Sequence, residues 1–151
     1  HFFMKSLIAL LFLPLTLFVF CYFDLSPSLP MENATRASFV MEERLEGYDY
    51  IQNGEQFIID VYSDIESFYA RHSQDIIGFN LYFQTLDIND FANSVNGQIF
   101  KRQSVEGIEI YEGYTTCYKD FRYVGGQKIN IQIAVKEKEV IVGFPLILTG
   151  F

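Results

Sequence analysis

The chain has 151 residues, of which 50% are apolar and 17% aromatic, and it carries a formal net charge of −8 at neutral pH. Such a composition excludes a disordered chain and is typical of one domain with a single core. Acidic residues are spread along the whole length without a basic block, which argues against binding to nucleic acid or to an anionic membrane surface, since both depend on Lys and Arg.

The N-terminal segment has the features of a secretory signal peptide in the expected order. His1–Phe3 are interpreted as an upstream extension before Met4, and Lys5 is followed by the largely apolar run Leu7–Phe20. A positive charge followed by a hydrophobic stretch is typical of an export signal. We therefore expect the domain to lie outside the cytoplasm.

Small residues at Ser26 and Ser28 favour cleavage after Ser28. The expected organisation is an extension plus signal peptide over 1–28 and one α+β domain over 29–151. Two other interpretations stay open. The apolar run, extended to Phe23, reaches the lower limit for a bilayer span and would be an uncleaved anchor. Cys21 offers a lipoprotein site, although the residue before a lipidated Cys is normally small. If this segment is not cleaved, it is the only part of the chain that we expect to contact a membrane.

The first element of the domain is a predicted helix over residues 34–45. Its apolar positions fall near one helical face, with charged residues between them, and Gly47 is placed to end it. Those positions are Ala34, Ala37, Met41 and Leu45.

A β-hairpin and a second helix are predicted next. Asn53-Gly54 is a strong two-residue turn signal between two alternating stretches. Ser63-Asp64-Ile65-Glu66 has the spacing of a capping box, so a short helix is expected over Asp64 to His72, with Ile65, Phe68 and Tyr69 inward.

Strands then dominate, interrupted by one further short helix. Ile76–Leu86 is expected to be a strand with a bulge near Gly78, and Asp87 to cap a helix that Asn96-Gly97 ends. Further strands are predicted over 98–103, 108–118 and 121–124, the last turned at Gly125-Gly126.

The C-terminal stretch from Lys128 is expected to form an antiparallel pair at the centre of the sheet. Residues 129–135 alternate apolar and polar, and after a polar break a continuous apolar run extends over 140–148. Helices interleaved with, and outnumbered by, strands joined through tight turns predict an α+β fold with a mainly antiparallel sheet.

The residue types that carry chemistry are few. His72, at a predicted helix end, is interpreted as a surface residue that complements the free carbonyls. Cys117 is the only cysteine of a cleaved domain and is interpreted as a small buried residue within a strand. Catalysis by a Cys–His pair needs the two side chains together, and their spacing does not indicate this.

Paired carboxylates are interpreted as solvated surface charge, because general acid–base work needs one buried member with a raised pKa. The pairs considered are Asp87 with Asp90, Glu106 with Glu109, and Glu109 with Glu112. The sequence contains no calcium-loop, P-loop or dinucleotide-binding motif. We expect no catalytic, cofactor-binding or metal-binding residue.

The segment Tyr111–Tyr123 is rich in aromatic residues and is the candidate binding face on one side of the sheet. Tyr and Arg are favoured at interfaces because they combine contact area with polar groups. Tyr is also an ordinary filler of strands. The residues considered are Tyr111, Tyr114, Tyr118, Phe121 and Arg122.

Three stretches of the C-terminal third resemble the end of the YwmB family, exported proteins of spore-forming Gram-positive bacteria. They are Gly113-Tyr114-Thr115, Asn130–Ala134 (NIQIA) and Val142–Ile147 (VGFPLI). Phe144 stands where that family usually has Thr, and the turn between the last strands is shorter. The resemblance implies a fold similar to the TATA-box-binding protein, a curved antiparallel sheet with helices on one face. Family members are generally longer, with two related halves, so a reduced single-unit version is implied. The resemblance brings no activity and no functional residues.

These observations predict an exported, non-enzymatic protein of the cell envelope that acts as a protein-interaction module. Its contact would be the sheet face or Tyr111–Tyr123, and its protein partner is unknown. The alternative is an envelope hydrolase that uses His72, Cys117 or a carboxylate pair; a buried pair or a His72–Cys117 contact in a cleft would favour it. A DNA-binding domain is the third hypothesis. The implied fold does not bring DNA binding with it, and minor-groove binders need basic residues on the sheet.

Overall fold

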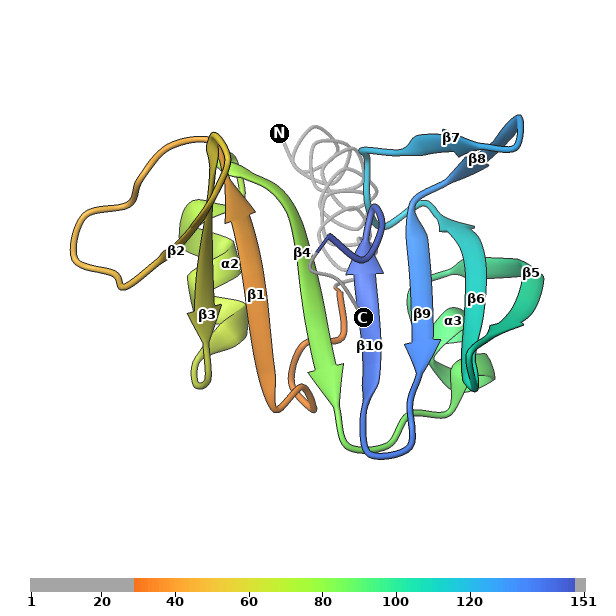
Figure 1. Cartoon of the computed structure of the whole chain (residues 1–151). Helices are drawn as coiled ribbons and strands as arrows, with labels where there is room; N and C mark the ends of the chain where they lie inside the picture. Colours follow the sequence, from red (N-terminus) through yellow and green to blue (C-terminus); the bar gives the residue numbers. More distant parts are fainter. Residues whose placement is uncertain (1–28, 149–151) are drawn as a thin grey trace, which may run out of the picture.

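The structure is a computed structural model that describes residues 29–148. The predicted signal peptide, the cleavage point after Ser28 and Cys21 lie outside the described residues. Within this range the chain forms an eight-stranded sheet, a two-stranded ribbon and two helices (Figure 1). The predicted α+β class is confirmed.

The elements follow one another along the chain with the bounds β1 Arg36–Met41, β2 Ile51–Asn53, β3 Gln56–Val61, α2 Ile65–His72, β4 Ile76–Phe83, α3 Ile88–Ser94, β5 Gly97–Val105, β6 Ile108–Thr115, β7 Arg122–Val124, β8 Gln127–Ile129, β9 Ile131–Val135 and β10 Val140–Phe144.

The large sheet has the order β2-β3-β1-β4-β10-β9-β6-β5, and every neighbouring pair is antiparallel. β9 and β10 are adjacent in the middle of the sheet, with Val142 opposite Ile133. This confirms the predicted central pair. The continuous apolar run of β10 is typical of a strand that is covered on both faces. β7 and β8 form the separate ribbon.

Both helices pack on one face of the large sheet, and the main core lies between the two layers. Phe68 of α2 stacks on Phe39 of β1 at 4.8 Å between ring centroids. Phe91 of α3 contacts Phe83 of β4 at 6.0 Å. Alternate residues of the central strands therefore fill this layer, as the two-residue repeat of a strand requires.

The predicted first helix over residues 34–45 is wrong, because Arg36–Met41 is strand β1. β1 lies between β3 and β4, with Phe39 opposite both Ile59 and Phe79. Ala37 and Met41 are four residues apart, and four positions bring side chains to one face in a helix and equally in a strand. The pattern therefore could not distinguish the two, and pairing on both sides decided for the strand.

The predicted β2–β3 hairpin is confirmed, but its two-residue loop is Gly54-Glu55, one position later than expected, with Gly54 at φ 62°. The α2 helix is also confirmed, whereas its capping box is wrong. Asp64 is the N-cap, in the left-handed region at φ 52°, and its side chain makes no capping hydrogen bond. Because Asp64 occupies the N-cap position, Ser63 lies outside the helix and does not cap it.

The predictions around α3 are confirmed. The Asp87 carboxylate accepts hydrogen bonds from the backbone N–H groups of Asn89 and Asp90 at 3.0 and 2.9 Å, and so caps the helix. The register of β1 against β4 shifts beside Gly78, which places the expected bulge there. Strands β4 and β6 end earlier than predicted, at Phe83 and Thr115.

After β10 the chain turns back and covers part of the sheet face opposite to the helices (Figure 1). The backbone N–H of Ile147 donates to Gln132 at 3.2 Å, and that of Leu148 to Asn80 at 3.3 Å. A Cβ on Gly143 would lie 2.4 Å from this segment, so a glycine is needed beneath it. The predicted strand to Leu148 therefore ends at Phe144, and residues 145–148 form a cover that we call the C-terminal strap.

Candidate functional site

The residues proposed for catalysis are not brought together. His72 lies in the last turn of α2, with its ring 4.7 Å from that of Phe68 and 6.0 Å from that of Tyr48. Cys117 lies in a bend after β6, where its Sγ donates to the carbonyl of Val95 at 2.7 Å. Because α2 and α3 lie behind different halves of the sheet, the two residues belong to different neighbourhoods. The prediction that Cys117 sits within a strand is wrong, since it is half-buried just beyond one.

One of the considered carboxylates is buried, contrary to the expectation of solvated surface charge. Glu112 is 3% exposed in the middle of β6. Its Oε2 lies 3.0 Å from Lys101 Nζ, and its Oε1 accepts from Gln132 at 3.3 Å. The ion pair offsets part of the cost of burying this charge, although Oε2 forms no hydrogen bond within residues 29–148.

The other carboxylates have structural roles or stay in solvent. Asp87 is the α3 cap, and Asp90 is exposed. Arg102 donates to Glu109 at 2.8 Å, and this hydrogen bond holds the pKa of the Glu109 carboxyl below its ordinary value. Glu109 and Glu112 point to opposite faces of β6, so no acid–base pair forms there.

A serine and a carboxylate do meet on the face opposite to the helices. Ser38 Oγ donates to Asp60 at 2.5 Å, and the Tyr82 hydroxyl lies 3.5 Å from Ser38. His72 lies at the end of α2, on the other face, so this cluster lacks the base that a serine nucleophile needs. Among the described residues no group of three His, Cys, Asp or Glu side chains could hold a metal ion.

The aromatic segment Tyr111–Tyr123 does not form one face. Tyr118 is 6% exposed and contacts the rings of Phe79 and Phe144, at 5.7 and 5.6 Å between ring centroids. Tyr111 is half-buried on the helix side of the sheet. Tyr123, in contrast, lies in β7, and Phe121 directly precedes this strand, at the base of the β7–β8 ribbon that projects from the body of the protein (Figure 1).

The ribbon carries an exposed aromatic patch, which we define as Phe121, Tyr123, Lys128 and Arg122. Tyr123 is 70% exposed, and its ring meets that of Phe121 edge to face at 5.6 Å. Lys128 Nζ lies 4.0 Å from the centre of the Phe121 ring, a cation–π contact that sequence reasoning missed. We call this surface the hairpin patch.

Local sequence explains the shape of the ribbon. Val124 pairs with Gln127, and the two residues between them, Gly125 and Gly126, have φ of 58° and 81°. A loop with positive φ at both central positions twists like the strands it joins and strongly favours glycine. The tip is therefore tight, and the aromatic side chains project from a defined hairpin.

The base of the ribbon is fixed by Asn130, which is fully buried. Its side chain accepts from the backbone N–H of Thr115 at 2.7 Å and donates to the carbonyls of Thr115 and Tyr118 at 2.8 and 2.7 Å. These bonds connect the end of β6, the segment before the ribbon and the junction of β8 with β9. The sequence showed Asn130 only as a polar residue in an alternating strand.

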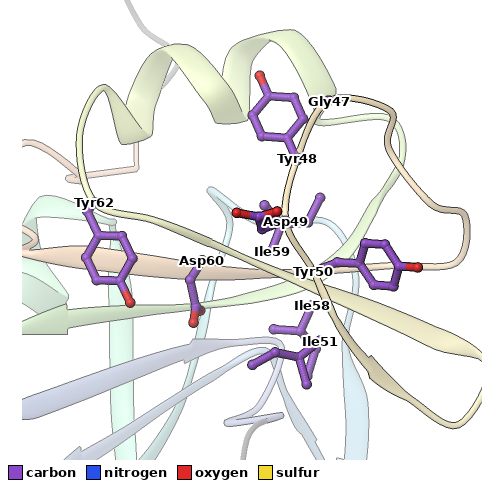
Figure 2. A pocket seen from close by; sticks show the side chains of 9 residues that line it. All are labelled: Gly47, Tyr48, Asp49, Tyr50, Ile51, Ile58, Ile59, Asp60 and Tyr62. Atoms are coloured by element: carbon purple, nitrogen blue, oxygen red, sulfur yellow. The ribbon is translucent and has the colours of Figure 1, made fainter.

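A second exposed region lies at the opposite end of the sheet, where the segment before β2 separates from β3. Figure 2 shows this hollow, of about 490 Å³. Tyr62 and Asp60 lie at one end of it, Tyr50 at the other, and Asp49 between them. We call this region the acidic hollow; it is lined by Gly47, Tyr48, Asp49, Tyr50, Ile51, Ile58, Ile59, Asp60 and Tyr62.

Within residues 29–148 no helix is both long enough and apolar enough to span a bilayer. The chain matches no protein-family model, no curated protein and no solved structure.

Proposed function

We propose that this protein is an exported, non-enzymatic module of the cell envelope that acts by contacting a partner protein through the hairpin patch. The observation that carries the proposal is the exposure of Tyr123 and Phe121 on a projecting ribbon beside Arg122 and Lys128. Aromatic residues and arginine are enriched at the energetic centres of interfaces, where rings supply rigid contact area and their neighbours exclude water.

The local contacts of the ribbon support the same proposal. A contact surface loses less entropy on binding when its side chains are already ordered. Here the glycine turn, the edge-to-face rings and the Lys128 contact order the patch in the free protein. Asn130 anchors the ribbon to the core through three hydrogen bonds.

The hydrolase alternative has less support in the geometry. His72, Cys117 and the Ser38–Asp60 pair occupy three separate places. Glu112, the buried carboxylate, is paired with Lys101. The net charge of −8 argues against the DNA-binding alternative, because minor-groove binders need basic residues on the sheet.

A relation to the YwmB family and a TATA-box-binding-protein-like fold are part of this proposal. The antiparallel sheet with both helices on one face supports them. So does the pairing of the NIQIA and VGFP stretches as neighbouring strands β9 and β10. Export rests on the sequence of residues 1–28, and the mass of the protein recovered from cell fractions tests it: a product beginning near Leu29 outside the membrane supports export.

The contact is tested by photo-crosslinking in the producing cell. A photoreactive phenylalanine analogue is placed at Tyr123 and, as a control, at Val105, an apolar residue that is 47% exposed at the end of β5. We expect a specific adduct from position 123 and none from position 105. Tyr123→Ala in the partner complex should weaken binding about tenfold or more. Equal adducts from both positions, or none, would contradict the proposal.

A further inference from the structure

The two exposed regions lie at opposite ends of the sheet and carry opposite charge. Residues 42–62, which include the acidic hollow, contain six acidic residues and one arginine, a net charge of −5. Residues 119–129, which include the hairpin patch, contain three basic residues and one acidic residue, a net charge of +2. β2 and β3 lie at one end of the sheet order, and the ribbon projects beyond the other half (Figure 1). The two ends of the sheet therefore carry opposite net charge.

The acidic hollow has an open strand edge as well as charge. β2 pairs with β3 only from Gln56 to Ile58, so residues 59–61 have no strand neighbour on their outer side among the described residues. An unpaired edge is a template for an added strand, whose backbone hydrogen bonds give affinity. Asp49 and Asp60 provide negative charge beside this edge, and neither forms an ion pair within residues 29–148.

The hairpin patch has the complementary features. β7 is three residues long, the same length as the open stretch of β3, and within the described residues it pairs only with β8. Arg122 is exposed, and within residues 29–148 its side chain donates only to the neighbouring Phe121 carbonyl, at 3.0 Å, so its charge is available to a carboxylate. Tyr123 lies beside it in the chain and is exposed, so its ring can pack against the tyrosine rings that line the hollow.

We propose that the occupant of the acidic hollow is the β7–β8 ribbon of a second copy of this chain. The ribbon adds β7 to the open edge of β3, Arg122 faces Asp49 or Asp60, and Tyr123 enters the hollow beside Tyr62. This inference rests on the proposed role of the hairpin patch as a contact surface, and it names the partner.

The contact is heterologous, because different surfaces of the two copies meet. Such a contact leaves one free hollow and one free ribbon on every dimer, so association continues to rings or chains as concentration rises. Since charge complementarity contributes, association weakens as salt increases and the screening length falls from about 10 Å at 0.1 M to about 3 Å at 1 M.

The test is sedimentation velocity of the purified protein over a concentration series at low and high salt. A ribbon variant carries Arg122→Gln and Tyr123→Ala, and a hollow variant carries Asp49→Asn and Tyr62→Ala, so that neither mutated surface gains a charge that could attract the other. All four side chains are exposed, so both variants should fold. Lys138→Gln and Glu137→Gln are matched controls, with the same charge changes at exposed positions between β9 and β10.

We expect the wild type and both controls to self-associate, and each double variant to associate about tenfold or more weakly. An equimolar mixture of the two double variants should form a 1:1 dimer and nothing larger, because one variant keeps an intact ribbon and the other an intact hollow. This complementation distinguishes the contact from any symmetric one.

Three results overturn the inference: a wild type that stays monomeric at millimolar concentration, association unaffected by either double variant, or a mixture that shows no complementation. If the Tyr123 crosslink then identifies a different protein, the proposed function stands and the self-contact alone is lost. If the crosslink also fails, both fall.

Discussion

Asn130 offers the sharpest test of how the fold presents the hairpin patch. Its side chain satisfies three backbone groups, the N–H and C=O of Thr115 and the C=O of Tyr118, at 2.7, 2.8 and 2.7 Å. Replacement by Ala leaves these groups buried without a partner. At roughly 1–1.5 kcal/mol for each unsatisfied group, Asn130→Ala should lower the free energy of unfolding by about 3–5 kcal/mol.

The assay is urea unfolding followed by circular dichroism, with the slope against denaturant expected to stay unchanged. For a domain with the 120 residues of 29–148, the same loss corresponds to a fall in Tm of about 12–20 °C. Asn93→Ala is the control, because Asn93 is exposed on α3, and it should change stability by less than about 0.5 kcal/mol.

A second substitution separates hydrogen bonding from simple loss of volume. Asn130→Asp keeps an acceptor for the Thr115 N–H but places an oxygen against the carbonyls of Thr115 and Tyr118. At neutral pH it should destabilise at least as much as Asn130→Ala. A loss below 1 kcal/mol for Asn130→Ala, or a well-tolerated Asn130→Asp, would refute the reasoning.

Three further predictions concern other parts of the fold. Burial, and secondarily the charge of Asp120, raises the pKa of the Tyr118 phenol, whose buried hydroxyl has no hydrogen-bond partner within residues 29–148. Because the pKa of Tyr118 is higher in the folded than in the unfolded state, the protonated phenol favours the folded state. This contribution is complete below about pH 10 and is lost as pH rises through the folded pKa. Tyr118→Phe should therefore leave stability at pH 7 within about 1 kcal/mol of wild type or raise it, and make stability fall less above pH 10, as urea titrations at both pH values would show. Gly143→Ala places a Cβ 2.4 Å from the backbone of Leu146, so it should cost about 1–3 kcal/mol and speed hydrogen exchange of the C-terminal strap; unchanged exchange would contradict the close contact. Asp87→Ala removes two capping hydrogen bonds and should cost about 1 kcal/mol by thermal unfolding, whereas Asp87→Asn should stay close to wild type.

The sequence by itself determined the elements whose signals are local. The Asp87 cap, the glycine turn of the ribbon and the alternation of residues 129–135 depend on neighbouring residues and on backbone preferences, so their consequences hold in almost any context. The aromatic residues of the ribbon were recognisable for the same reason, because Phe121 and Tyr123 both shortly precede the Gly125-Gly126 turn.

Only the tertiary structure decided the rest, because the deciding contacts join residues far apart in sequence. Residues 36–41 became a strand through β3 and β4 on either side. Tyr118 lies in the core and Asn130 bonds to Thr115 because β6 and β9 are paired. The acidic hollow exists because β2 is too short to cover β3. A residue pattern reports which side chains share a face, and it carries no record of which distant chain segment will lie against that face.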